Sequence, residues 1–398
     1  MLSDRKIMGQ ENLKLPLVLL AGSLITMAGG VLAPILPDVA QQLNLNPVLV
    51  GNLVSIHCLT LALFCLPLGI LTDQLSPSKV LIPSLTLYSI FGCAGALMTD
   101  FWTLLATRAL LGAASGGIAA ASLGWLGQEY EGEERSQAIG YATATLTIAG
   151  IICPLLGGWL GSWNWRWAFC LYGVALPLAF LTHWIIAPSE AHTHNKAHSV
   201  SDLSGTFIKL LRHRAFWRLM VGLTMASLVM YAVFIYLPLY LKETSNTTPT
   251  LNGLLLACES LGAALISAFG VQPLAQKIGR DRSTALGFTI MAGTLAIVPL
   301  FQDYTALLCI AVFFGIGLGL VIPNIYNALA NLAPQKLQGS VLATGTGASF
   351  LGQFLSPIVL GPILGIGDIT WVFYSAAAVA LTGSCILFYE PSFPQHQE

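Results

Sequence analysis

Twelve apolar runs divide this chain from end to end and constrain its fold more than any other feature. A helix needs about 20 apolar residues to cross a hydrocarbon core of ~30 Å. The sequence is 9% charged, against roughly 25% in an average soluble domain. Continuous rather than alternating runs indicate helices and not the strands of a barrel. We therefore predict an all-α membrane protein with spans at residues 15–36, 47–71, 79–99, 101–127, 136–161, 165–187, 216–241, 250–272, 282–302, 304–329, 339–365 and 369–389.

The basic residues predict which side each loop faces. If the N-terminus is cytoplasmic, 14 of the 17 Lys and Arg residues fall in cytoplasmic segments, while Arg166 and Lys242 lie outside and Arg108 lies within a span. An excess of Lys and Arg in short loops marks the cytoplasmic side. The first run is too long for the apolar region of a signal peptide, so we expect it to remain as the first span. Both termini are predicted to be cytoplasmic, in a protein of the cell inner membrane.

Two stretches about 200 residues apart share one pattern, which predicts an internal duplication. LLATRALLGAASGGI aligns with LLCIAVFFGIGLGLV and superposes Gly112 on Gly315 at an offset of 203. WRWAF aligns with ITWVF at an offset of 204. Each copy would hold six helices, and an even number makes the copies parallel repeats. We expect a six-helix bundle at 1–187, a cytoplasmic linker at 188–215 and a second bundle at 216–398.

The linker and the cysteines are the places where a metal site needs consideration. His192, His194 and His198 are closely spaced in the linker, and they indicate either a metal site or, as we favour, a solvated polar segment. All eight cysteines fall inside predicted spans without CxxC spacing, which is typical of small apolar residues. We expect no metal site.

Residues 150–161, GIICPLLGGWLG, carry a proline and four glycines in a segment with the length of a membrane helix. Gly150, Pro154, Gly157 and Gly158 share one helix face at their spacing. Helices in lipid associate through close backbone approach at small residues. The face is therefore either a surface on which a neighbouring helix moves or a static packing surface.

This segment resembles the fifth-helix antiporter motif of the major facilitator superfamily, particularly of its drug:proton antiporter branch. Cys153 stands where that motif commonly has a glycine. RALLGAASGG is similar to the family's fourth-helix motif at Arg108 and Gly112. The resemblance covers nearly the whole chain and implies two six-helix bundles around a central cavity that opens alternately to each side.

GILTDQLSPSK resembles the family's loop between helices two and three. It matches at Gly69 and Asp73, departs at residues 74 and 76–78, and keeps Lys79 as a cation. EERSQA is similar to the family's entry to helix five, at Arg135. Asp73 can meet helix N-termini or Arg135 and so hold the cytoplasmic side closed. Leu274 replaces the acid in the second half, so we expect this contact in the first half alone.

Three ionisable side chains, His57, Arg108 and Glu259, lie well inside predicted spans. A charge at a helix centre costs about 2.5–3.5 kcal/mol, so such residues usually face a partner or a watery cavity. Glu259 is the predicted proton carrier, unless it forms a fixed structural pair with Arg108. His57 either carries a proton as well or is a neutral histidine bonded to a nearby carbonyl.

Further polar and aromatic residues are candidates for the substrate cavity. Tyr231, Tyr236, Asn324 and Asn327 lie in predicted spans, and PNIYN is expected to interrupt the tenth helix at Pro323. Aromatic residues at span boundaries are instead expected to anchor the protein at the membrane surface. These predicted anchors are Trp102, Trp163, Trp165 and Trp371.

Together these features predict a secondary transporter that exports a small amphipathic or hydrophobic compound in exchange for protons. An uptake symporter for a small organic ion is the alternative, as is a non-transporting assembly, lipid-handling or pigment-handling protein on the same scaffold. We expect the lipid bilayer, protons and a small-molecule substrate as partners, a monomer, and neither nucleic acid nor a cofactor. The sequence contains no P-loop, HExxH or GxSxG motif, so an enzyme is not expected.

Overall fold

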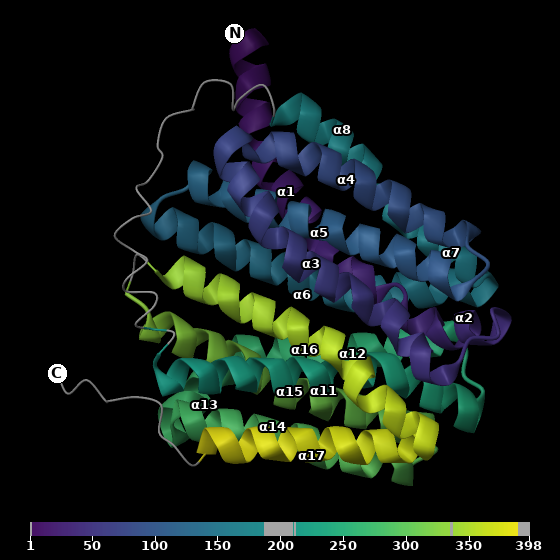
Figure 1. Cartoon of the computed structure of the whole chain (residues 1–398). Coiled ribbons are helices and arrows are strands. Elements are labelled where there is room, and N and C mark those ends of the chain that lie inside the picture. The colour runs from purple at the N-terminus through teal and green to yellow at the C-terminus, as the bar shows by residue number, and fades with distance from the viewer. Residues whose placement is uncertain (1, 187–209, 211, 335–336, 389–398) are drawn as a thin grey trace. The chain divides into compact units, whose positions relative to one another are not determined.

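The computed structural model describes residues 2–186, 210, 212–334 and 337–388. Most of the predicted linker, with its three histidines, lies outside these residues. Within them every regular element is a helix (Figure 1), and twelve spans are long and apolar enough to cross a membrane. Each of the twelve coincides with a predicted apolar run, because a length of about 20 apolar residues is a signal that needs no tertiary contact.

The described residues form two compact units. Unit 1 comprises the described parts of 1–46, 52–196 and 248–254, and unit 2 those of 47–51, 197–247 and 255–398. The first half of the chain forms α1 (Leu2–Gly30), η1 (Ala33–Ile35), α2 (Leu36–Gln42), α3 (Pro47–Leu75), α4 (Pro77–Ala94), η2 (Gly95–Leu97), α5 (Phe101–Glu129), α6 (Gly132–Trp163), α7 (Trp165–Phe169), η3 (Cys170–Val174) and α8 (Ala175–Ile185). The remainder supplies α11 (Arg214–Ser245), α12 (Pro249–Phe269), α13 (Val271–Ile278), α14 (Arg280–Ile297), η4 (Val298–Leu300), α15 (Tyr304–Leu332), α16 (Gln338–Ile366) and α17 (Ile369–Phe388).

The helices pair in the same way within each unit. In unit 1, α4 packs against α5 and α8, while α1 packs against α5, α6 and α8. In unit 2, α14 packs against α15 and α17, while α11 packs against α15, α16 and α17. The pairings correspond one to one when α4 is matched with α14 and α1 with α11. This correspondence favours the internal duplication that the sequence offsets predict.

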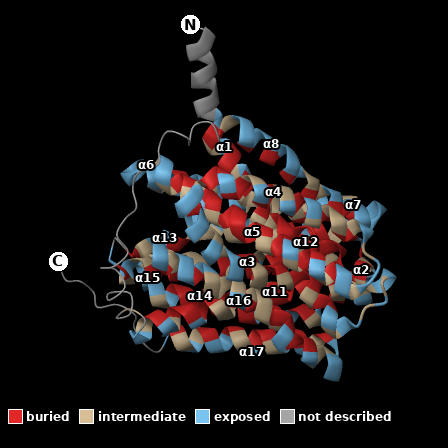
Figure 2. Ribbon diagram, turned by 45° about the horizontal axis from the view of Figure 1, so that its top comes forward, coloured by how far each residue is buried: buried red, intermediate tan, exposed pale blue. Residues whose placement is uncertain are grey.

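Burial differs strongly from helix to helix (Figure 2). Most of α5 and of α11 is buried, whereas little of α6 is. Three of the predicted membrane-surface anchors, Trp102, Trp163 and Trp371, are exposed. The prediction for Trp165 is wrong, because that side chain is 1% exposed. Its indole N–H donates a hydrogen bond to Gln42 Oε1 over 2.7 Å, which satisfies the buried donor inside the unit.

Asp73 lies inside a helix rather than in the predicted loop, and Gly69 lies in the same helix, within the predicted span at 47–71. Helix α3 continues to Leu75, and α4 begins at Pro77. Both motif residues therefore occupy the last two turns of α3, and the connection shrinks to Ser76. Lys79 lies in the first turn of α4.

Ser76 has a backbone conformation that glycine adopts far more easily. Its φ is 149° and its ψ is 151°, in a region that is essentially restricted to glycine. Gly279 precedes α14 with φ 88° and ψ 152°, which is the same kind of turn 203 residues later. The second copy of the turn thus has the residue that suits it, and the first copy does not.

We expect Ser76→Gly to raise the free energy of unfolding by about 1 kcal/mol, because it removes the strain of a side chain at positive φ. Gly279→Ala should lower it by about 1–3 kcal/mol for the same reason. A Cβ at Gly279 meets nothing within 4 Å, so the effect would come from the backbone alone. Thermal unfolding of the purified variants in detergent measures both. A destabilised Ser76→Gly protein would contradict this account.

Two aspartates cap helices at equivalent places. Asp100 precedes α5 and accepts a hydrogen bond from the Thr103 backbone N–H over 3.0 Å. Asp303 precedes α15 and accepts one from the Ala306 N–H over 2.8 Å. Each satisfies an N–H group that the first turn of a helix leaves unpaired. The two caps lie 203 residues apart, which the sequence comparison did not use.

The Asp100 cap should make stability depend on pH. Hydrogen bonds from the Thr103 hydroxyl and backbone hold the pKa of Asp100 below its ordinary value of 3.8. The stabilising contribution is therefore complete at neutral pH and is lost as the pH falls through this lowered pKa. We expect Asp100→Ala to lower the thermal midpoint at pH 7, and we expect its difference from the wild type to shrink progressively as the pH falls below 3.8. Asp100→Asn keeps an acceptor but does not titrate, so its difference from Asp100→Ala should not depend on pH.

Candidate functional site

The small residues of α6 bring backbones into contact at two neighbours within unit 1. A Cβ added at Gly157 would lie 2.7 Å from the Val31 carbonyl oxygen. A Cβ at Gly158 would collide with the Pro249 carbonyl at the start of α12. Gly157 and Gly158 of the predicted face therefore pack closely against neighbouring backbone in this structure. They contact two different segments, at Val31 and at Pro249.

The first of these partners is a break in the first span. Helix α1 ends at Gly30, and η1 follows with Pro34, which has no N–H to donate. Gly161 faces Ile35 in η1, where a Cβ would collide with the Ile35 side chain. The face of α6 opposite the break therefore requires glycine at Gly157 and Gly161.

Asn252 links the start of α12 to the break in the first span. Its side-chain amide donates a hydrogen bond of 3.1 Å to the Pro34 carbonyl oxygen, and the side chain is buried. The Thr250 hydroxyl donates to the Gly158 carbonyl over 3.4 Å. The sequence analysis gave neither residue a role, because a polar residue in the first turn of a helix is ordinary and its distant partner is invisible in one sequence.

The close approach at Gly158 can be tested against a glycine on the same helix. Gly158→Ala should cost about 1–3 kcal/mol of stability, because the added methyl forces two backbones apart. Gly140→Ala is the matched control, since a Cβ there meets nothing within 4 Å and alanine favours a helix over glycine by about 1 kcal/mol. Thermal unfolding in detergent measures both. Equal midpoints for the two variants would rule out the contact.

Arg108 lies in an aromatic enclosure in unit 1. Its side chain is fully buried, and the guanidinium carbon lies 4.7 Å from the ring centre of Tyr172 and 4.9 Å from that of Phe169. Nη2 donates a hydrogen bond of 3.3 Å to the Gly92 carbonyl. Cation–π contacts of this kind stabilise a buried cation. Gly95 keeps the space open, because a Cβ there would collide with Phe169.

The enclosure leaves part of the guanidinium unsatisfied. Nε and Nη1 of Arg108 are buried without a hydrogen-bond partner, and no ion pair to Arg108 occurs among the residues the structure describes. A buried cation that lacks a carboxylate is costly. The two free N–H positions can bind an anionic or carbonyl oxygen.

Tyr88 and Tyr172, which lie near Arg108, form hydrogen bonds with the backbone of the first span. The Tyr172 hydroxyl donates to the Ala28 carbonyl over 3.0 Å, and the Tyr88 hydroxyl donates to the Leu24 carbonyl over 2.7 Å. The two rings meet edge to face with centroids 5.7 Å apart. Sequence reasoning missed Tyr88, Phe169 and Tyr172, although Phe169 ends the repeated segment WRWAF.

His57 and Glu259 occupy equivalent positions in their own units. Gly112 approaches the backbone of His57 so closely that a Cβ would collide with its carbonyl, and Gly315 approaches the Glu259 carbonyl in the same way. The glycines are 203 residues apart and the ionisable residues 202 apart. Each half therefore places one ionisable side chain opposite the glycine of its fourth span.

Neither of these side chains is fully satisfied. Glu259 is 1% exposed, and its Oε2 atom has no hydrogen-bond partner in the described part of the chain. His57 is 2% exposed, with Nε2 3.4 Å from Cys58 Sγ, and its Nδ1 atom has no hydrogen-bond partner among the residues that the structure describes. A buried carboxyl with an unpartnered oxygen is suited to hold and release a proton.

The other predicted cavity residues lie in unit 2, and only some of them face a cavity. Tyr231 is buried and stacks on Phe234 with ring centres 5.7 Å apart, and Tyr236 is buried. Helix α15 runs through Pro323 without interruption, so the expected break at PNIYN is wrong. Asn324 donates hydrogen bonds to Ser283 Oγ over 3.2 Å and to the Leu320 carbonyl over 2.9 Å.

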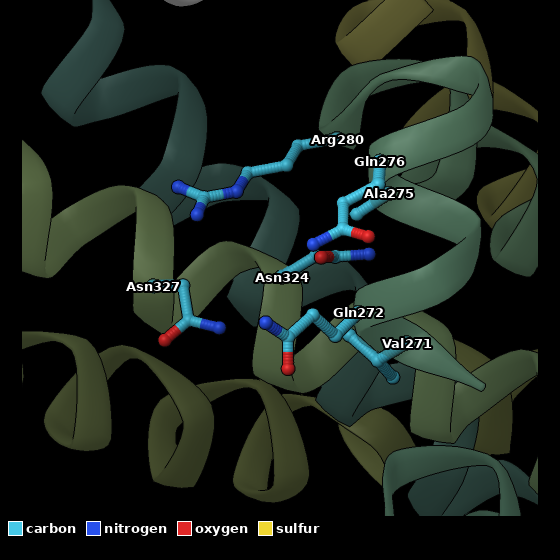
Figure 3. Close-up of a pocket in the computed structure, with 7 residues that line it drawn as sticks. All are labelled: Val271, Gln272, Ala275, Gln276, Arg280, Asn324 and Asn327. Carbon is cyan, nitrogen blue, oxygen red and sulfur yellow. The ribbon is translucent and has the colours of Figure 1, made fainter. Parts of the chain in front are cut away.

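Asn324 and Asn327 line a cavity of about 380 Å³ in unit 2 (Figure 3). Helix α13 and the first residue of α14 form its other walls. Five of its seven lining side chains are polar, and the lining consists of Val271, Gln272, Ala275, Gln276, Arg280, Asn324 and Asn327. The sequence analysis identified the two asparagines and missed the residues of α13 and Arg280, because it treated that segment as a degenerate loop motif.

Asp73 and Arg135, the residues of the predicted closing contact, form no ion pair within the described part of the chain. The Arg135 guanidinium lies over α5 instead, with Nη2 3.2 Å from the position of a Cβ on Gly127. Asp73 is exposed at the end of α3. The two residues remain a predicted contact of another conformation.

Twelve apolar spans in two units, with buried ionisable groups inside the spans, are features of a polytopic transport protein. The family model of the Major Facilitator Superfamily matches residues 18–247 and again 241–398, and the chain belongs to this family. It is therefore a multi-pass membrane transporter and not an enzyme.

Curated relatives of the chain, at low identity, include one named as an exporter and one named as a resistance protein. It is 23% identical over 372 residues to the bacillibactin exporter of Bacillus subtilis, covering 89% of this chain and 90% of that one. It is 23% identical over 376 residues to the quinolone resistance protein NorA of Staphylococcus aureus, covering 92% and 94%. A solved bacterial homolog of the human lysosomal transporter Spinster, in an inward-facing, unoccupied conformation, has the same fold, with a TM-score of 0.76, 14% identity and 95% of both chains covered.

Proposed function

We propose that this protein exports a small amphipathic or hydrophobic compound by alternating access, in exchange for protons. The observation that carries the coupling is the Glu259 carboxyl, which is buried in unit 2 with Oε2 unpartnered. The direction of transport is supported by a relative that is named as an exporter. A coupled exporter needs a group that binds a proton in one conformation and releases it in another, and Glu259 has the chemistry for that step.

The energy of one proton is sufficient for such a reaction. A single charge that moves through 100 mV releases about 2.3 kcal/mol. That free energy corresponds to a concentration ratio of roughly 50-fold for a neutral substrate at 25 °C. One carboxyl per transport cycle therefore suffices.

The orientation and the internal symmetry belong to the same proposal. We place both termini in the cytoplasm and the protein in the cell inner membrane, with parallel six-helix repeats at 1–187 and 216–398. The matching helix pairings, the two aspartate caps and the equivalent positions of His57 and Glu259 support the repeats. In a conformation closed to the cytoplasm, Asp73 meets Arg135 at the end of α3, with Gly69 and Lys79 beside it.

A second candidate is a symporter for a small organic anion. Arg108 favours it, because its Nε and Nη1 are buried without a partner and the described residues include no carboxylate paired with it. A substrate carboxylate would satisfy both positions. Substrate and proton would then move in the same direction.

The test is the direction of proton flow in proteoliposomes. An outward gradient of substrate should drive protons the opposite way in an exporter and the same way in a symporter. A library of amphipathic and anionic compounds is screened with a fluorescent pH indicator inside the vesicles. If no compound drives proton flux and one protein partner copurifies, the chain is instead a non-transporting member of the family.

Glu259→Gln should abolish proton-driven transport and leave substrate binding and counterflow intact, because the amide keeps the size of the side chain and cannot release a proton. Glu243→Gln is the matched control, since Glu243 is exposed near the end of α11. We expect this control to transport as the wild type does. Full proton-driven transport by Glu259→Gln between pH 5 and 9 would show that another group carries the proton.

A further inference from the structure

The cavity between α13, α14 and α15 has the composition of an oxyanion site. Its seven lining residues include one cation, Arg280, and four carboxamide side chains, and none of them is acidic. Figure 3 shows the Arg280 guanidinium reaching over the space that the carboxamides of Gln272 and Gln276 face. Guanidinium and carboxamide groups together offer many N–H donors to a ligand that has several acceptor oxygens.

Arg280 has no acidic partner among the described residues. Its side chain is exposed, and no ion pair to it occurs in the part of the chain that the structure describes. Asp281 follows it in α14 and lines a smaller adjoining cavity together with Arg280 and Asn324, but it does not line this one. Lys277 and Arg282 flank the site in sequence. The local balance is therefore cationic, which favours an anion over a cation or a neutral ligand.

The polar atoms of Asn324 are held in place. Its amide nitrogen donates to Ser283 and to the α15 backbone, which fixes the side chain without drawing on Arg280 or the glutamines. The cavity of about 380 Å³ has the volume of roughly a dozen waters, more than one phosphate requires. A phosphate that carries a small polar substituent fits this size.

We propose that this cavity binds a phosphate group, with Arg280 as its charged partner and Gln272, Gln276 and Asn327 as hydrogen-bonding partners. The phosphate belongs either to a soluble phosphate ester or to the headgroup of an anionic phospholipid. Basic pockets at the ends of membrane helices bind lipid headgroups by the same chemistry. The site is separate from Glu259 and Arg108, and it would regulate or stabilise the transporter rather than carry the substrate.

The experiment measures binding to the purified full-length protein. Inorganic phosphate and glycerol phosphate are titrated at constant ionic strength, and the thermal midpoint is followed by tryptophan fluorescence. In a second arm, short-chain phosphatidylglycerol or phosphatidylcholine is added, and retained lipid is counted by native mass spectrometry. Saturable stabilisation in the first arm identifies a soluble phosphate, and selective retention of phosphatidylglycerol in the second arm alone identifies a headgroup.

Variants connect either result to the cavity. Arg280→Gln should weaken the apparent affinity by roughly tenfold to a hundredfold, because a charge-assisted contact is lost. Arg282→Gln removes the same charge from an exposed neighbour that does not line the cavity, and it should bind as the wild type does. Arg280→Lys keeps the positive charge but lacks the planar set of guanidinium N–H donors, so it should bind phosphate with intermediate affinity.

Two outcomes overturn the proposal. One is the absence of saturable stabilisation and of selective lipid retention in both arms. The other is an equal loss of affinity in Arg280→Gln and Arg282→Gln, which would indicate a diffuse charge effect. Because the measurement needs no transported compound, its result does not depend on whether the protein is an exporter.

Discussion

Close approach of helix backbones at glycine is the interaction on which the rest of this structure depends. Leucine surfaces gain nothing by meeting each other in lipid, so association relies on contacts that small residues permit. Gly112 and Gly315 each meet the backbone of a helix that carries an ionisable residue, and Gly157 and Gly158 meet two further segments. Almost any side chain at these four positions would push apart the elements that hold the functional groups.

Ionisable groups are buried where these contacts bring helices together. Arg108 is enclosed by two aromatic rings, and Glu259 is buried with an unpartnered oxygen. Both arrangements carry a cost in free energy that a purely structural core would avoid. In a transporter, a proton, a substrate or a second conformation can supply the missing partner and so offset the free energy of burying the unpaired group.

Sequence reasoning succeeded where the signal is local and failed where a partner decides the outcome. The twelve spans follow from apolar length, and the burial of Arg108, His57 and Glu259 follows from their positions inside those spans. The ends of elements did not follow. Helix α3 extends through the expected loop at Asp73, and α15 continues through Pro323, because neighbouring helices stabilise turns that isolated segments would lose.

The sequence by itself determined that this chain crosses the membrane twelve times, which residues are ionisable within the spans, and that its halves share a pattern, since all three depend on the order and hydropathy of neighbouring residues. Tertiary structure alone decided that Trp165 is buried on Gln42, that aromatic rings enclose Arg108, and that Asn252 reaches Pro34. It also brought α13 beside α15 to form a polar cavity. These contacts join residues far apart in the chain, and no local pattern encodes which distant partner a side chain meets.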